Sequence, residues 1–526
     1  MEAYVLDALA ASVEQVVPGL GPLAGMLAGL AGELAGPGRA VMTLDAMEQL
    51  AAVRGRELLR AVLQYALDVQ ADAEVRLPEV TGADGVARTR AERGHGRAIV
   101  TTLGEVRVQR IAYRAGVKGV PALFPRDAVL NLPLREYSWQ LQQLAVIFTR
   151  SGAYEQGQEF TEAATGVRIG KRQLQQITAE AAADAPGFYP ALSREQQPGD
   201  PEPEQPEQPE QPEQDQPVMP LGLSADGKGV AMRPESRRRR AKSPDQRVRT
   251  FAKRRGTGEK GHKRMAETGC VFDVQAVPRT PGQVMAPRPG GGKKEAPQAV
   301  NRWYTVDIAA GRDHTISDIF DQAERRDPGR ARPWIALVDG DIYQISLFQD
   351  QAAARGITIT ILVDFIHVLE YLWKAAWCFH APRDPAMEDW VSAQALDILH
   401  GRAPEVITRI RQLAEDHPPA GTEHAKIIRK TLHYLDAKQP YLDYPAALAA
   451  GWPIATGVIE GACRHLVQDR MGITGARWST SGAQAILWLR AIRASGDHDS
   501  YWNHHIQQEH QRNHLSRYQD HLGLAA

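Results

Sequence analysis

The feature that most restricts the fold of this chain is a tract at residues 197–217 with the sequence QPGDPEPEQPEQPEQPEQDQP. It lacks the apolar side chains that form a hydrophobic core, and its prolines cannot donate hydrogen bonds to a sheet. We therefore expect a disordered, acidic Pro/Glu/Gln linker over residues 196–217. The chain has 526 residues, which is more than a single core usually serves. The tract thus separates parts that have cores of their own.

The N-terminal part is predicted to be mostly helical. Apolar residues recur at helical spacing from 43 to 70, whereas residues 99–114 alternate as a β-hairpin that turns at Gly104. Two exposed strand positions of this hairpin are Arg107 and Arg110.

Residues 154–182 are a candidate helix-turn-helix, with two short amphipathic helices around a turn at Gly166. Lys171, Arg172 and Gln173 on the second helix could reach phosphates and base edges of DNA. The alternative is a helical hairpin without any role in DNA binding, and the pattern by itself does not separate the two.

After the linker, the order of predicted elements becomes informative. Three strands, a helix, a strand, a helix and a strand are expected, in that order, at 220–230, 265–274, 301–309, 314–326, 334–340, 342–356 and 357–364. This is the order of a ribonuclease H-like α/β core, a mixed sheet with helices on both faces. The pattern then becomes helical throughout, which predicts an all-helical insertion.

The domain organisation expected from these patterns has six parts. They are an N-terminal helical extension (1–42), a mostly α DNA-binding part (43–195), the linker (196–217), the first part of the catalytic core (218–364), the helical insertion (365–456), and a second part of the core with C-terminal helices (457–526).

Three carboxylates suggest metal-assisted phosphoryl transfer. Asp226 and Asp339 each follow an apolar strand and precede a glycine, and Glu460 lies on the first turn of a helix that begins near Gly457. Carboxylates at adjacent strand ends supply the hard oxygen ligands that divalent cations require. A single Asp-Gly pair is more often a turn, but two at the ends of neighbouring strands favour a site. Arg464, four residues after Glu460, could contact a phosphate.

Several long segments resemble ISKra-type bacterial insertion-sequence transposases. They include LSADGKGVAMRP, WIALVDGDIYQI, VDFIHVLEYLWKAAWCF, GWPIATGVIEGACRHLVQDRM and TGARWSTSGAQAILWLRAI, and the likeness covers most of residues 40–520. The resemblance implies a DDE transposase of ribonuclease H-like fold that uses Mg²⁺ or Mn²⁺. Its DNA would be the terminal inverted repeats of the element and the target, bound by a homodimer or higher homo-oligomer.

Carried over residue by residue, the acidic triad of that family falls on Asp226, Asp339 and Glu460. Asp364 and His367 match a [C/D]xxH motif of related transposases, so Asp364 is the rival second carboxylate. His367 could orient a scissile phosphate or a metal-bound water; the alternative is a core histidine at a helix start.

Charge is unevenly distributed along the chain. The formal net charge is -1, yet residues 233–264 hold 14 Lys or Arg against three Asp or Glu. Because this run follows Asp226 directly, phosphate binding is the favoured interpretation over a merely solvated face. The candidate DNA contacts within it are Arg237, Arg238, Arg239, Arg240, Lys253, Arg254 and Arg255.

Other features favour a reducing cytoplasm, and the resemblance implies a bacterial protein associated with the nucleoid. The three cysteines are far apart in sequence, and the apolar run at 16–32 is interrupted by Gly and Pro, so neither a disulfide framework nor a membrane span is expected. The C-terminal histidines (His498, His504, His505, His510 and His514) are expected to be solvated. Two competing functions are a metal-dependent nuclease or resolvase without strand transfer, and a domesticated DNA-binding regulator.

Overall fold

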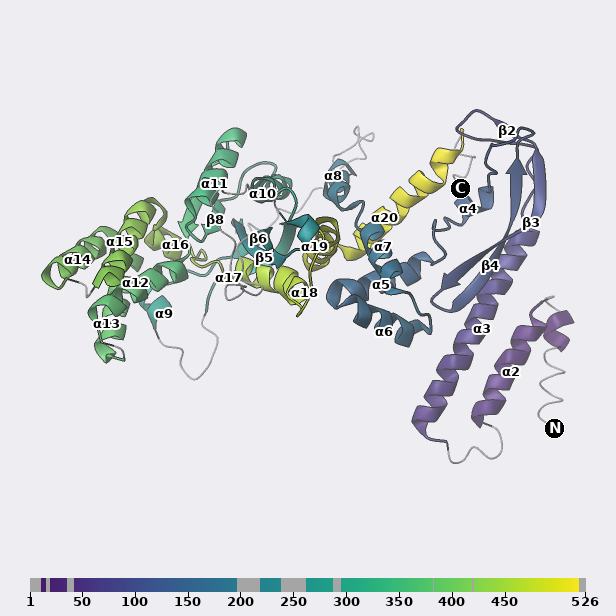
Figure 1. Cartoon of the computed structure of the whole chain (residues 1–526), viewed down its shortest axis with the longest axis horizontal. Helices are drawn as coiled ribbons and strands as arrows, with labels where there is room; N and C mark the ends of the chain where they lie inside the picture. Colours follow the sequence, from purple (N-terminus) through teal and green to yellow (C-terminus); the bar gives the residue numbers. More distant parts are fainter. Residues whose placement is uncertain are drawn as a thin grey trace, which may run out of the picture. The chain divides into compact units, whose positions relative to one another are not determined.

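The computed structural model describes residues 11–15, 19–35, 42–195, 218–237, 262–286, 295–381, 383–418 and 421–519 (Figure 1). Two compact units are present. One comprises Met1–Asp184 together with Asp499–Ala526, and the other comprises Ala185–His498. The predicted linker and the arginine-rich residues 238–261 lie outside the described residues.

The N-terminal unit begins with a helical hairpin. Helix α2 (Gly21–Ala35) packs against the long helix α3 (Leu44–Asp72). The predicted β-hairpin is confirmed as β3 (Arg90–Thr101) and β4 (Gly104–Arg114), which pair in antiparallel register beside a short ribbon of β1 (Val80–Thr81) and β2 (Ala87–Arg88).

The two arginines of this hairpin differ in environment. Arg107 is exposed, as expected. Arg110 is not, because its guanidinium pairs with Asp127 at 2.5 Å and covers the ring of Phe124. Asp127 lies on helix α4 (Pro125–Val129), so Arg110 joins the hairpin to this helix and does not present a free charge.

The candidate helix-turn-helix is present as a pair of helices. It consists of α6 (Tyr154–Thr165) and α7 (Lys171–Ala181), and both pack on α5 (Trp139–Ser151). Gly166 ends α6 with φ of 72°, a conformation that favours glycine. The buried side chains Leu174 and Ile177 fix one face of α7 to its neighbours, which leaves Lys171 and Arg172 exposed.

Helix α20 (His498–Asn513) corrects two expectations. Residues 499–526 belong to the N-terminal unit and not to the second part of the core. Three histidines that were expected in solvent are buried, namely His498, His505 and His514, at 4%, 2% and 7% exposure. Two of them bond polar groups of the N-terminal unit: His514 Nε2 lies 2.7 Å from the Leu132 carbonyl, and His505 Nδ1 lies 2.7 Å from Asp184 Oδ2.

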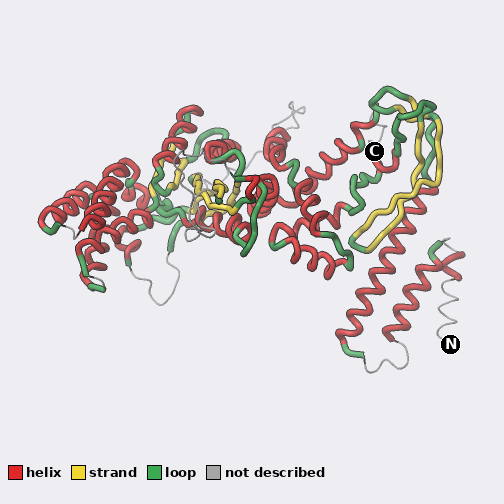
Figure 2. Tube along the Cα trace, viewed as in Figure 1, coloured by secondary structure: helices red, strands yellow, loops and turns green. Residues whose placement is uncertain are grey.

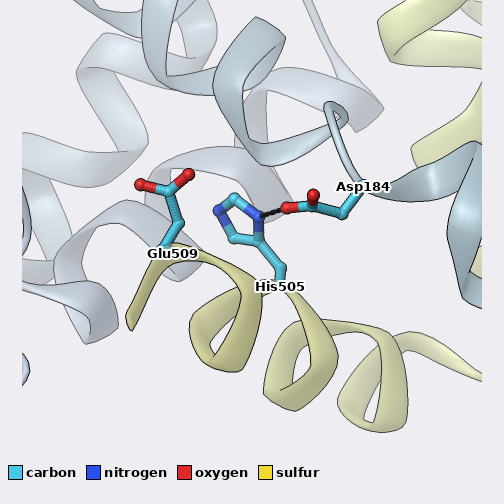
Figure 3. A group of neighbouring side chains, drawn as sticks. All are labelled: Asp184, His505 and Glu509. Atoms are coloured by element: carbon cyan, nitrogen blue, oxygen red, sulfur yellow. Dashed lines mark hydrogen bonds and ion pairs between the residues drawn. The ribbon is translucent and has the colours of Figure 1, made fainter. Parts of the chain in front are cut away.

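An ionic cluster fixes α20 to the end of α7 (Figure 3). Asp184 and Glu509 lie on either side of the His505 ring, and Arg512 donates to both carboxylates. These bonds hold the pKa of Asp184 down to about 2, although burial opposes ionisation. Asp184, His505 and Glu509 also have the spacing of metal ligands. Arg512 already supplies the positive charge there, so we assign the cluster a structural role.

The second unit contains a five-stranded mixed sheet. Its strands are β5 (Leu221–Ala231), β6 (Lys263–Gln275), β7 (Gln298–Asp307), β8 (Trp334–Val338) and β9 (Ile359–Val363), in the spatial order β7-β6-β5-β8-β9. The first three pair antiparallel, whereas β8 runs parallel to both β5 and β9. All five predicted strands are confirmed, and so is the prediction that the first and fourth are neighbours.

Helices cover both faces of this α/β sheet. Helix α10 (Arg312–Arg326) packs against β6, where a Cβ on Gly269 would collide with Ile319. The next residue of β6, Cys270, points to the opposite face because side chains alternate along a strand. There the helix α17 (Gly457–Ala462) and the π-helical turn η5 (Cys463–Gln468) pack against β5. Helix α11 (Ile342–Arg355) connects β8 to β9.

Side chains from two helices contact the edge strand β7, and some of them form hydrogen bonds with backbone groups along it. From helix α19 (Thr480–Ser495), Gln484 bonds both the Ile308 amide and the Val306 carbonyl, and Ser495 accepts from the Tyr304 amide. Unpaired strand edges invite association with other chains, and these bonds remove part of that exposure. Helix α8 (Ala185–Glu195) also reaches β7, where Tyr189 contacts the Trp303 ring.

Helices occupy the region predicted to be an all-helical insertion (Figure 2). It consists of α12 (Phe365–Phe379), α13 (Pro385–Leu399), α14 (Ala403–Asp416), α15 (Gly421–Lys438) and α16 (Tyr444–Ala449), with the short helix α9 (Pro281–Met285) against α13. Helix α18 (Asp469–Met471) follows η5. Among the described residues, every helix is too short or too polar to cross a lipid bilayer.

Candidate metal centre

The two strand carboxylates lie level with each other on neighbouring parallel strands. Ser224 of β5 is in register with Leu337 of β8. Asp226 and Asp339 each follow two residues later, so they occupy the same edge of the sheet. Both side chains are partly exposed. The two Asp-Gly pairs thus belong to neighbouring strands, as predicted, but only Asp339 follows the end of its strand, because β5 continues past Asp226 to Ala231 in its pairing with β6.

Asp364 lies next to this edge but is fully buried. Its amide donates to the Val338 carbonyl at 2.8 Å, which fixes it directly beyond β8 and β9. Its Oδ1 accepts from the Ile366 amide at 2.7 Å and caps α12, while its Oδ2 accepts from the amide and the hydroxyl of Thr456. Burial opposes ionisation, but bonds from His367 and Thr456 hold the pKa of Asp364 below its ordinary value.

His367 lies between two acidic groups. Its Nδ1 is 3.3 Å from Asp364 Oδ2, and its side chain is about one third exposed. The bond to Asp364 raises the pKa of His367, and the charge of Asp339 raises it further. The ring is therefore protonated more readily than an imidazole without these acidic neighbours.

Glu460 completes a group with Asp364 and His367. One ligand atom from each lies within 4.8 Å of the others. The Thr456 hydroxyl joins two of them, because Oγ1 bonds Asp364 Oδ2 and lies 3.2 Å from Glu460 Oε1. A hydroxyl has one proton and can donate to one carboxylate at a time. The ligand atoms of the three residues are thus close enough that they could hold a metal ion.

Asp226 lies on β5, close to Cys463 of η5. Its Oδ1 accepts from its own neighbour, the Gly227 amide, at 2.7 Å. The thiol of Cys463, at the start of η5, has its pKa raised to about 12 by burial and by the adjacent Asp226 charge. Because Cys463 follows Glu460 by three residues, α17 and η5 bring Glu460 to the side of the sheet that Asp226 occupies.

Two residues of the helical insertion reach the strand ends, and sequence reasoning missed both. The Tyr434 hydroxyl lies 3.4 Å from the Asp339 carbonyl, over Gly340, where a Cβ would come within 2.9 Å of it. Lys438, at the end of α15, is buried at 5% exposure. Burial lowers the pKa of Lys438, while the charges of Asp341 and Asp339 oppose that shift. A lysine at the end of an amphipathic helix gives no sequence indication of such a position.

The remaining candidates for DNA contact vary in availability. Arg464 and Arg172 are exposed, whereas Lys171 pairs with Glu155 at 2.5 Å on the surface. Gln173 accepts from the Gly170 amide and so caps α7. Arg237 Nε lies 3.4 Å from the Met232 carbonyl. The six other predicted contacts, Arg238, Arg239, Arg240, Lys253, Arg254 and Arg255, lie outside the described residues.

Arg464 was expected to share a helical face with Glu460. The π-helical turn that begins at Cys463 changes the register of side chains after α17, so the four-residue spacing no longer applies as in an α-helix. Both side chains are nevertheless exposed.

Acidic and imidazole groups that could hold a metal ion are thus gathered at one edge of an α/β sheet. No protein-family model matches the chain, and no curated protein sequence is significantly similar to it.

Proposed function

We propose that the chain is a DDE transposase, a metal-dependent enzyme that cleaves DNA at the ends of its insertion sequence and joins those ends to target DNA. The observation that carries the proposal is that Asp226 and Asp339 follow paired positions of two neighbouring parallel strands, while Glu460 lies on the helix α17 that packs against β5. The strand order, three antiparallel strands followed by two parallel ones with an insertion after the last, supports a ribonuclease H-like core. Resemblance to ISKra-type transposases supports the same assignment.

Asp339, and not Asp364, is the second catalytic carboxylate in this proposal. The oxygens of Asp364 accept from the Ile366 amide, from Thr456 and from His367, and its side chain is 1% exposed. A carboxylate with so many internal donors has little capacity left for a cation. Asp339 is partly exposed, and its side chain accepts from the Asp341 amide at 2.8 Å. Asp364 acts instead as a positioning residue for His367 and Thr456.

Asp226, Asp339 and Glu460 would hold Mg²⁺ or Mn²⁺, hard cations that prefer carboxylate oxygen. When bound, such ions lower the pKa of the attacking water or hydroxyl and stabilise the departing oxygen. The protein contributes positioning and charge. Protonated His367 would donate to a non-bridging oxygen of the scissile phosphate, with Asp364 fixing the ring through Nδ1.

The chemistry has two balanced steps. In the first, water attacks phosphorus at the element end, the P–O bond to the 3′ oxygen breaks, and that oxygen leaves as a hydroxyl after taking a proton. In the second, the freed 3′ hydroxyl attacks a target phosphorus and loses its proton, the P–O bond to the target's 3′ oxygen breaks, and that oxygen takes up a proton and leaves as a hydroxyl. Both steps use the same acidic site, and neither requires an oxidant or reductant.

Double-stranded DNA is the proposed partner. The basic run at 233–264 follows β5, the strand that carries Asp226, directly in the sequence. Such charge binds the phosphate backbone without regard to sequence. Discrimination of element ends is assigned to the first turn of α7, where Arg172 is exposed.

The proposal is tested with the full-length protein and labelled DNA from both flanks of its gene, with Mg²⁺ or Mn²⁺. We expect 3′-hydroxyl ends and joined products with a target plasmid, and loss of both in Asp226→Ala, Asp339→Ala and Glu460→Ala with binding retained. Cleavage without joined products would indicate the nuclease instead. Binding without cleavage by the unmodified protein would contradict the enzyme assignment and favour a regulator.

A further inference from the structure

The parallel ladder between β5 and β8 stops before it reaches the strand carboxylates. Its last pair is Ser224 with Leu337. Strand β8 ends one residue later, whereas β5 continues along β6. Asp226 and Asp339 both lie past the last pair. The separation of these two segments therefore depends on contacts other than the backbone ladder between β5 and β8.

A buried glutamine spans the two segments. Gln344, on the first turn of α11, is 2% exposed, and its Nε2 donates to the Ala225 carbonyl at 2.6 Å. Ala225 directly precedes Asp226 on β5. Helix α11 begins three residues after Asp339, whose side chain accepts from the amide of the N-cap residue Asp341 at 2.8 Å. Gln344 thus joins the backbone beside one carboxylate to the helix that begins beside the other.

The amide of Gln344 is an unusual choice for packing alone. Its Oε1 is buried and has no hydrogen-bond donor among the described residues. An unpaired buried oxygen opposes the stabilisation that the bond from Nε2 supplies. An apolar side chain of similar length could fill the same space without that unpaired oxygen. The feature that only the amide provides is the bond to Ala225.

Arg312 forms a second connection between the same segments. Its guanidinium bonds Glu267 Oε2 at 3.3 Å and also bonds Asp341, the N-cap of α11. Glu267 is paired with Gly227, and a Cβ on Gly227 would come within 2.7 Å of the Glu267 carboxylate. These contacts do not involve Gln344. The start of α11 should therefore stay attached to the sheet when Gln344 is replaced.

We propose that Gln344 is a positioning residue that sets the separation of Asp226 and Asp339, and thereby the affinity of this edge of the sheet for Mg²⁺. This inference rests on the proposed function, which makes both carboxylates ligands of one metal centre. Like charges repel when no cation lies between them, so the spacing relaxes unless bonds such as that from Gln344 oppose it. Mg²⁺ requires near-ideal octahedral geometry, whereas Ca²⁺ accepts variable geometry. Loosening the spacing should therefore weaken Mg²⁺ binding more than Ca²⁺ binding.

Gln344→Met tests this role in the full-length protein without DNA. Methionine keeps the length of the side chain and lacks the donor. Gln349→Met is the matched control, because Gln349 is exposed on the same helix and bonds the Tyr441 hydroxyl at 3.3 Å. Electron paramagnetic resonance of free Mn²⁺ gives the Mn²⁺ dissociation constant, and displacement of Mn²⁺ by Mg²⁺ or Ca²⁺ gives theirs. Circular dichroism verifies that each variant is folded at the temperature of the titrations.

The dissociation constant of Mg²⁺ is expected to rise about tenfold in Gln344→Met, as for other residues that orient metal ligands, and that of Ca²⁺ to rise less. Gln349→Met should match the unmodified protein. Unchanged constants in Gln344→Met, or an equal rise for both cations, would overturn the positioning role. If Gln344→Met does not fold, Gln344→Asn takes its place with the same expectations, because the shorter side chain withdraws the donor from Ala225.

Failure of the metal centre itself has a different signature. In that case the unmodified protein would not bind Mn²⁺, or Asp339→Ala would bind it equally well. Either result would overturn the proposed centre, and the role of Gln344 with it. Mn²⁺ binding that is lost in Asp339→Ala but unchanged in Gln344→Met would leave the centre intact and overturn the role of Gln344 alone.

Discussion

The amide and the hydroxyl of Thr456 both donate to Asp364 Oδ2, across 92 positions of sequence. Asp364 caps the first helix of the insertion, and Thr456 directly precedes α17. The insertion therefore leaves the sheet and returns to it at the same point. This contact explains how Glu460, more than 90 residues after β9, is fixed beside Asp364 and His367.

Removal of the Thr456 hydroxyl should loosen this junction. Thr456→Val keeps the side-chain shape but removes a donor to a buried carboxylate, so we expect a loss of about 2 kcal/mol in unfolding free energy. Urea denaturation followed by circular dichroism measures it. Thr408→Val is the control, because that hydroxyl bonds a backbone carbonyl on the exposed surface of α14. An equal loss in both variants would show that the Thr456 contact has no special role.

Replacement by alanine should mainly affect DNA cleavage at Asp339 and mainly affect stability at Asp364. Asp339→Ala is expected to abolish DNA cleavage with little loss of stability, since Asp339 is partly exposed. Asp364→Ala leaves His367 and Thr456 without their acceptor and should lower the unfolding free energy by roughly 3 kcal/mol. Thermal unfolding and a cleavage assay on the same preparations distinguish the two. Cleavage that persists in Asp339→Ala would reassign the second carboxylate to Asp364.

Acid should weaken the attachment of α20 through Asp184. The pKa of Asp184 is lowered in the folded state from its ordinary 3.8 to about 2, mainly by bonds from His505 and Arg512 that overcome burial. Its contribution, roughly 2 kcal/mol, is therefore present above about pH 4 and is lost as pH falls toward 2. The difference between the urea midpoints measured at pH 7 and at pH 3 should be smaller in Asp184→Asn than in the unmodified protein. The exposed Asp350→Asn should keep the full pH difference of the unmodified protein.

The two basic regions should contribute differently to DNA binding. Alanine at Arg237, Arg238, Arg239 and Arg240 should weaken binding to flanking DNA and to random DNA equally. The slope of log affinity against log salt should become shallower by about 0.9 for each phosphate that is no longer neutralised. Arg172→Ala should instead reduce discrimination between the two DNAs. Titrations at several salt concentrations measure both effects, with the exposed Arg194→Ala of α8 as control. Equal weakening by Arg172→Ala on both DNAs would make α7 a backbone clamp.

Local sequence determined the elements of the sheet and much of the candidate site. Strands at 221–231, 334–338 and 359–363 follow from short apolar runs, and Gly166 and Gly104 mark turns that need positive φ. Because β5 and β8 are parallel neighbours, Asp226 and Asp339 had to meet once the strand order was known. These features follow from the periodicity of apolar residues, the residues that favour turns, and the length of each apolar run, all of which neighbouring residues in the sequence determine.

Tertiary structure alone decided which ionisable side chains are partly exposed and which are buried and hydrogen-bonded. Asp364 and Asp339 both follow a strand in the sequence, yet packing of α17 buries the first under Thr456 and leaves the second partly open. The same holds for Lys438 and for His505 and His514, whose burial depends on helices far away in the chain. Burial and hydrogen bonding set the charge state of an ionisable group, and both depend on residues brought together only by folding.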